Sequence, residues 1–289
     1  MSRVHDGRSP LALPGLCYLP RFLSVAEADE LIAFFASLTP LWEQRHSGRD
    51  HGRGGQRDRR ITRPVYWLGA WQFACLGYYA EPDHREGRCL RAEPFPAVMR
   101  STLERLRPCL QAHGTPNRLP LLPNTCLINY YGSERGAGPP VDQARLRMHR
   151  DGEPGPVVMF CVGQPGLLEF VDPAQVDAPE LAIWTRHRSA VVFSGPYFKE
   201  QLYHRIVQVR RGGSPALDCR VPNFDLRRVS VSFRHVPESL VTDLDGLPSQ
   251  ARNTVRAYVQ ELARHSDHFA RQLALAPGPG GEQPSPQTP

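Results

Sequence analysis

Short apolar runs separated by Gly and Pro fill residues 126–236 and constrain the fold most strongly. The runs are CLINYY (126–131), VVMFCVG (157–163), LLEFV (167–171), AVVFSG (190–195), YHRIVQVR (203–210) and RVSVSFRHV (228–236). Each run has the length of a strand rather than of a helix, and the residues between the runs are turn signals. The sequence therefore predicts a mainly β core, arranged as a sandwich or barrel.

Two amphipathic segments precede this β core. Ser24 and Glu27 form the sequence pattern of a capping box, and apolar residues recur at helical spacing from about 25 to 38. Pro94-Phe95-Pro96 opens a second such segment, which runs to about residue 112. We therefore expect two helices before the β core, and an α+β fold class overall.

Composition divides the chain into segments. We expect a flexible N-terminus (1–14), a main domain (15–240), a C-terminal helical extension (241–275) with its helix from about 249 to 273, and a disordered Pro- and Gly-rich tail (276–289). No run has the length of a signal peptide or of a membrane span. The seven cysteines show no metal-binding spacing, which fits reduced thiols. These features favour the cytoplasm. We also expect a monomer, although the sequence itself is silent on oligomeric state.

Positive charge is in excess and comes almost entirely from arginine. Lys and Arg number 35 against 29 Asp and Glu, a net charge of +6, and Lys199 is the only lysine. A basic surface suits nucleic acid, although an arginine-rich coding bias would give the same excess. Residues 45–63 concentrate Arg, Gly and His without periodicity. They fit either a flexible loop or a basic lid that contacts a phosphate backbone.

Two histidines and one aspartate within the β core form a candidate metal-binding set. His149 and Asp151 are one residue apart and share one face of a strand, and His204 lies in another strand-like run. Non-haem Fe(II) oxygenases use this ligand set, which leaves coordination positions open. The H-x-D pair alone is weak evidence, because His265-x-Asp267 repeats it in the expected C-terminal helix, where residues i and i+2 do not face each other. Taken alone, His149 would fit an ordinary surface turn.

The last run of the β core carries two arginines on one face. Period two places Arg228, Ser230, Ser232 and Arg234 together, opposite a face of apolar residues that would meet a core. Two guanidinium groups inside a barrel are costly without anions, and guanidinium groups hold carboxylates in bidentate fashion. The pattern therefore predicts a dicarboxylate near the metal. An outer strand with solvated arginines is the alternative.

Together these residues resemble the AlkB family of 2-oxoglutarate- and Fe(II)-dependent dioxygenases, over roughly residues 15–236. The resemblance implies a double-stranded β-helix (jelly roll), an oxidoreductase activity, and Fe(II), 2-oxoglutarate and O₂ as cofactors. It implies that iron is bound by His149, Asp151 and His204. It also implies that 2-oxoglutarate contacts Asn129, Tyr131, Arg228, Ser230 and Arg234.

The same resemblance implies contacts to a flipped nucleobase from Trp71, Tyr78 and Glu153, with Tyr79 next to the second aromatic. The implied reaction is oxidative dealkylation of N-alkylated bases in DNA or RNA, as repair or demethylation. The base leaves its stack to reach the metal, and aromatic side chains stack on it. Core packing is the alternative for the two aromatics, and a solvated turn position is the alternative for Glu153.

Two insertions, residues 132–148 and 211–226, depart from the family pattern. The segment after residue 240 matches nothing in that pattern either. None of these departures touches the metal-binding set, but inserted loops decide what enters a pocket. An oxygenase of the same fold that acts on a protein or a small molecule therefore stays open as the alternative function.

Overall fold

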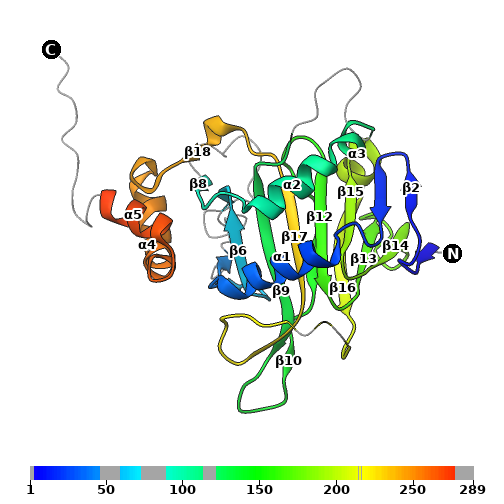
Figure 1. The fold of residues 1–289 in the computed structure, drawn as a ribbon, viewed down its shortest axis with the longest axis horizontal. Helices are drawn as coiled ribbons and strands as arrows, with labels where there is room; N and C mark the ends of the chain where they lie inside the picture. Colours follow the sequence, from blue (N-terminus) through cyan, green and yellow to red (C-terminus); the bar gives the residue numbers. More distant parts are fainter. Residues whose placement is uncertain are drawn as a thin grey trace.

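Two β-sheets packed face to face form the centre of the computed structural model, which describes residues 3–45, 59–72, 89–112, 122–213, 215 and 217–276 (Figure 1). The smaller sheet has the strand order β1-β14-β13-β16-β11. In the same order, these strands span Arg3–His5, Leu181–Thr185, Gly166–Val171, Tyr203–Val209 and Leu146–His149.

The larger sheet has the order β10-β9-β17-β12-β15-β3-β2, with β6 paired to β9. Its bounds, in that order, are Val141–Asp142, Thr125–Glu134, Phe224–Arg234, Val157–Gly163, Ser189–Phe193, Leu16–Leu19 and Leu11–Leu13, with Val65–Leu68 for β6. All the runs predicted as strands lie in these two sheets.

The layer between the sheets is one apolar core. It includes Met159 and Phe193 from the larger sheet and Phe170 and Ile206 from the smaller one. The outer face of the larger sheet is covered by α1 (Val25–Ser37) and α2 (Ala97–Arg105), which lie across its strands in Figure 1. Strands that are buried on both faces explain the nearly continuous apolar runs in the sequence.

The predicted N-terminal helix is confirmed, together with its cap. Glu27 N donates to Ser24 Oγ at 3.2 Å, and Ser24 N donates to the Glu27 carboxylate at 2.8 Å. The second predicted helix is divided at Leu106 into α2 and α3 (Arg107–Ala112). Both helices bury apolar residues against the larger sheet.

Residues 3–5 and 11–13, within the segment expected to be flexible, form strands in the described structure. β1 pairs with β14 and β2 pairs with β3. The edges of both sheets offer unpaired backbone groups, and these N-terminal residues satisfy them. A polar composition did not reveal this pairing.

The single helix expected near the C-terminus is instead two helices, α4 (Ser249–Ala263) and α5 (Asp267–Leu275). Ser266 caps α5 by accepting a hydrogen bond from Phe269 N. His265 therefore lies in the break between the two helices, and Asp267 is the first residue of α5. A small sheet of β7 (Ala70–Gln72), β8 (Cys89–Arg91) and β18 (Val241–Thr242) lies between the two large sheets and these helices in Figure 1.

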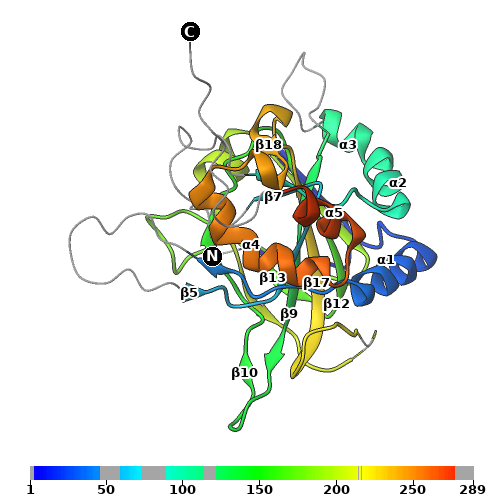
Figure 2. The same ribbon diagram turned by 90° about the vertical axis from the view of Figure 1, so that its left-hand side faces the viewer.

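The first insertion extends β9 and β10 into a hairpin that projects from the rest of the sheet (Figure 2). A short hairpin of β4 (Gln44–Arg45) and β5 (Arg59–Arg60) brackets the arginine-rich segment. Residues 46–58, the aromatics Tyr78 and Tyr79, and the tail from 277 lie outside the described residues. Within the described part, the helices are too short or too polar to span a bilayer.

Candidate metal centre

His149 and His204 face each other across two antiparallel strands. His149 ends β11, His204 lies near the start of β16, and the two residues are directly opposite in the strand register. Their ring centroids are 4.2 Å apart. The Nδ1–H of His149 donates to the carbonyl of Arg147 at 2.9 Å, which leaves Nε2 as the nitrogen with a free lone pair.

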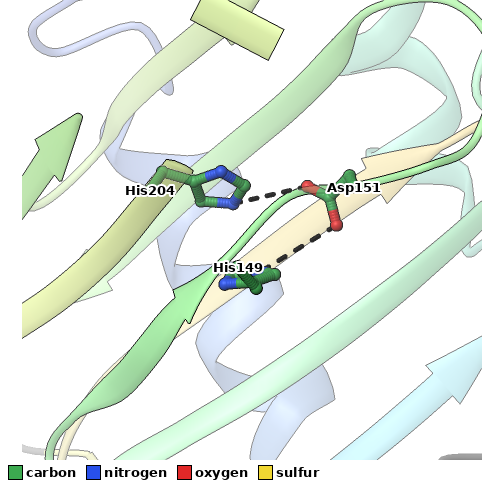
Figure 3. A group of neighbouring side chains, drawn as sticks. All are labelled: His149, Asp151 and His204. Atoms are coloured by element: carbon green, nitrogen blue, oxygen red, sulfur yellow. Dashed lines mark ion pairs between the residues drawn. The ribbon is translucent and has the colours of Figure 1, made fainter. Parts of the chain in front are cut away.

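Asp151 completes the cluster from the turn that follows β11 (Figure 3). Its carboxylate oxygens lie 3.4 Å from His204 Nε2 and 3.9 Å from His149 Nε2. One ligand atom from each of the three side chains lies within 4.8 Å of the others. Metal–ligand bonds are about 2.0–2.2 Å long for nitrogen and oxygen donors, so the three side chains are close enough to share one ion.

The electrostatics of the cluster favour the protonation states that bind metal. Burial and the neighbouring His204 lower the pKa of His149 far below its ordinary value, which keeps this ring neutral. Burial alone would raise the pKa of Asp151, but the Arg234 guanidinium and the hydrogen bond from His204 hold it well below its usual range. A neutral imidazole beside an ionised carboxylate is the form that coordinates a cation.

Arg234 orients the Asp151 carboxylate of the candidate cluster. Its Nη1 donates to Asp151 Oδ1 at 2.9 Å and to Glu153 Oε1 at 3.1 Å. Arg234 is 5% exposed and Glu153 is 3% exposed. One buried cation therefore joins two buried acids, and Glu153 lies beside the cluster rather than in a solvated turn.

Arg228 is fully enclosed and links the two sheets. From β17 its guanidinium donates to the carbonyls of Gln164 and Thr185, to Thr185 Oγ1 and to Cys161 Sγ. Its Nε has no hydrogen-bond partner, and no ion pair joins it to a carboxylate within the described chain. A buried guanidinium with no acid beside it is a fitting partner for a ligand carboxylate.

The remaining predicted cosubstrate residues form one patch on neighbouring strands. Asn129 is opposite Ser230, and Tyr131 is opposite Arg228, in the β9–β17 register. Ser230 Oγ donates to Tyr131 Oη at 3.3 Å. The structure thus brings together a donor-rich patch and a three-ligand cluster, joined along β17 through Arg228 and Arg234. This set of donors fits a metal ion with a bound dicarboxylate.

Trp71 is placed in the core against the C-terminal helices. It is 1% exposed and makes edge contacts with Tyr258 of α4 and Phe269 of α5. Its indole N–H donates to Glu43 at 2.6 Å. These contacts are those of core packing, the alternative to base stacking. They also join the C-terminal helices to the domain, together with the hydrogen bonds from Ser266 to Glu93 and from Gln272 to the carbonyl of Arg91.

Three residues that sequence reasoning missed lie close to the predicted site. The Trp67 indole N–H donates to Glu43 at 3.0 Å. The guanidinium carbon of Arg234 lies 5.4 Å from the Trp67 ring centroid. Lys199 donates to the carbonyl of Glu153 from a single π-helical turn, Pro196–Gln201, a conformation that is frequent at functional sites. In the sequence, Lys199 stands out because it is the only lysine. Trp67 does not stand out, because several other aromatic residues surround it in the sequence.

The third missed residue is Arg63, which precedes β6. It is 8% exposed and donates through Nε to Asn129 Oδ1 at 2.7 Å. In the sequence it is one arginine among many in an arginine-rich segment. Only the pairing of β6 with β9 reveals where this side chain lies.

Comparisons with known proteins identify the family and the fold. A family model described as the 2OG-Fe(II) oxygenase superfamily matches residues 15–234. The structure of OsALKBH1 aligns over 78% of this chain and all of that chain, at 17% identity and a TM-score of 0.51. A 2OG-Fe(II) oxygenase family oxidoreductase from Burkholderia pseudomallei aligns over 76% of this chain and 84% of that chain, at 16% identity and a TM-score of 0.42. No curated protein matches the sequence. The predicted jelly roll is confirmed.

Proposed function

Because the chain belongs to the 2OG-Fe(II) oxygenase superfamily, we propose that it oxidatively dealkylates N-alkylated bases in DNA or RNA. The family membership makes it a 2-oxoglutarate-dependent dioxygenase that uses Fe(II), 2-oxoglutarate and O₂. The substrate class is the proposal, and it is argued from the residues around the metal cluster.

In this proposal His149, Asp151 and His204 hold the iron. Arg228, Asn129, Tyr131 and Ser230 bind 2-oxoglutarate. When bound, iron, cosubstrate and O₂ supply the oxidation that hydroxylates the alkyl carbon, and the resulting hemiaminal releases an aldehyde and the restored base. The protein positions the reactants and excludes water. Arg234 holds the Asp151 carboxylate in place and would offer a positive charge to a carboxylate of the cosubstrate.

The observation that carries the substrate class is the buried carboxylate of Glu153. It lies two residues beyond a metal ligand, is 3% exposed, and shares the Arg234 guanidinium with Asp151. A carboxylate only accepts hydrogen bonds and carries negative charge. Bases such as 1-methyladenine and 3-methylcytosine carry a positive charge and amino donors, so they are complementary to such a group.

The surface next to the site supports the same substrate class. Arg145, Arg147 and Arg150 are exposed on and beside β11, the strand that carries His149. Exposed arginines can contact phosphates without reading sequence. With a net charge of +6 on the whole chain, this surface would strengthen binding of a polyanion and make the binding sensitive to salt.

Turnover on defined oligonucleotides tests the proposal. The protein is incubated with Fe(II), 2-oxoglutarate, O₂ and an oligonucleotide that carries one 1-methyladenine or 3-methylcytosine. We expect formaldehyde, succinate and the unmodified base in equal amounts, with an unmethylated oligonucleotide and His204→Ala as controls. Normal binding of metal and 2-oxoglutarate without turnover on any alkylated oligonucleotide would instead favour a protein or small-molecule substrate.

A second variant tests the role of Glu153 itself. Glu153→Gln keeps the shape of the side chain but removes its negative charge. We expect it to raise KM for the methylated oligonucleotide more than KM for 2-oxoglutarate. An equal effect on both constants would show that Glu153 serves only to hold Arg234.

A further inference from the structure

Arg63 lies just before β6 and reaches the donor-rich patch of Asn129 and Tyr131 from the side of β9 opposite to Arg228. Val65 of β6 is paired with Asn129 of β9, so Arg63, two residues earlier, falls at the level of Tyr131. On the other side of β9, Arg228 of β17 is paired with Tyr131. The Arg63 guanidinium carbon lies 5.6 Å from the Tyr131 ring centroid. Two buried arginines therefore flank one tyrosine from its two neighbouring strands.

The hydrogen bond from Arg63 decides which way the Asn129 amide faces. A guanidinium can only donate, so the atom that it contacts at 2.7 Å must be the amide oxygen, Oδ1. The Nδ2 group is then the part of the amide that is left to face other partners. Among the residues that the structure describes, it makes one long hydrogen bond, 3.4 Å to Leu127 O. Asn129 thus offers N–H donors, which a carboxylate needs, rather than an oxygen, which would repel it.

The charge of Arg63 also lacks a protein counterion. It is 8% exposed, yet no ion pair joins it to a carboxylate among the residues that the structure describes. The nearby Arg60, by contrast, is paired with Glu134 at 2.6 Å on the surface. A buried, unpaired guanidinium is costly, and a bound anion beside Asn129 and Tyr131 would offset that cost.

From these contacts we propose that Arg63 is a positioning residue for 2-oxoglutarate. It turns the Asn129 amide so that Nδ2 donates to the cosubstrate, and it adds positive charge on the β6 side of the site, opposite Arg228. The inference rests on the proposed role of Asn129 in cosubstrate binding. It does not depend on which substrate is oxidised.

The test is the affinity for 2-oxoglutarate of the Mn(II)-loaded protein, measured by calorimetry without nucleic acid. Losing a charge-assisted hydrogen bond weakens binding by about 10-fold or more, so we expect at least that increase in Kd for Arg63→Ala. Arg63→Lys should recover part of the affinity, because an ammonium can still donate to Asn129 Oδ1. Arg60→Ala is the matched control, and Mn(II) affinity should be unchanged in all three variants.

A double-mutant cycle separates positioning from a general structural effect. If Arg63 acts through Asn129, the combined Arg63→Ala and Asn129→Ala variant should bind 2-oxoglutarate hardly more weakly than Asn129→Ala alone. Fully additive losses would overturn the positioning role. Wild-type affinity for 2-oxoglutarate in a folded Arg63→Ala variant would also overturn the positioning role. If the affinity for an oligonucleotide fell in that same variant, Arg63 would belong to the substrate site instead. Because nucleic acid is absent from the main assay, a failure to dealkylate any oligonucleotide leaves this test intact.

Discussion

His149 and His204 are direct cross-strand partners on β11 and β16, with their ring centroids 4.2 Å apart. Residues directly opposite on antiparallel strands have their Cβ atoms about 4.5–5.5 Å apart. Two imidazoles in such positions converge on one point, and Asp151 joins them from the segment that follows β11. The metal cluster is a consequence of strand register.

Removing one imidazole should abolish metal binding. We expect His204→Ala to weaken Fe(II) or Mn(II) affinity by at least about 100-fold, because even residues behind the ligands cost 10–100-fold when removed. Calorimetric titration with Mn(II) measures this directly. The chain offers a matched control in His265→Ala, which removes the histidine of the second H-x-D pair and should leave metal affinity unchanged. Retained Mn(II) affinity in His204→Ala would remove this residue from the ligand set.

A single methyl group at residue 166 should weaken cosubstrate binding. A Cβ on Gly166 would lie 2.9 Å from Arg228 Nε, closer than side-chain carbons are found, and the enclosed guanidinium has little room to move. We therefore expect Gly166→Ala to raise Kd for 2-oxoglutarate by about 10-fold, the order of a lost charge-assisted contact. Gly136→Ala, where a Cβ meets nothing within 4 Å, is the control. An unchanged Kd in folded Gly166→Ala would place the cosubstrate away from Arg228.

Truncating Trp71 should destabilise the fold rather than only reduce activity. Its ring is buried against Tyr258 and Phe269, so we expect Trp71→Ala to lower the free energy of unfolding by about 3–5 kcal/mol. Urea denaturation measures this, with the partly exposed Trp184→Ala as the comparison. Wild-type stability together with weaker oligonucleotide binding would instead support a stacking role for Trp71.

The Glu27–Arg105 contact should make stability depend on acid pH. The hydrogen bond from Arg105 lowers the pKa of Glu27 to about 2, below its ordinary value near 4.5. A lowered carboxyl pKa stabilises the folded state above the unfolded value, and this contribution is lost as the pH falls from about 4.5 to 2. We expect Glu27→Gln, which keeps a capping residue, to be less stable than the wild type at pH 7, with the difference shrinking across that window.

Thermal melts of both proteins between pH 7 and pH 2 check this expectation. Glu30→Gln on the same helix is the control, because Glu30 is exposed and forms no ion pair within the described chain. A difference between Glu27→Gln and the wild type that stays constant across the whole pH range would show that the ion pair does not contribute.

Much of the fold could be predicted because its signals are local. The apolar runs give the strands, the Ser24–Glu27 pair gives the first helix, and period two places Arg228 and Arg234 on one face. The sequence also allowed a ligand set to be proposed from its three residue types, and the structure brings those three side chains together. The family-model match over residues 15–234 confirms the predicted family.

What the sequence could not give is which elements lie next to one another. The pairing of residues 3–5 with β14 and the packing of Trp71 against α4 and α5 depend on partners far along the chain. For the same reason Arg63 looked like one arginine among many. Periodicity in a sequence reports which face of an element a residue occupies, but only strand pairing across the sheet decided that Arg63 meets Asn129 and that His149 meets His204.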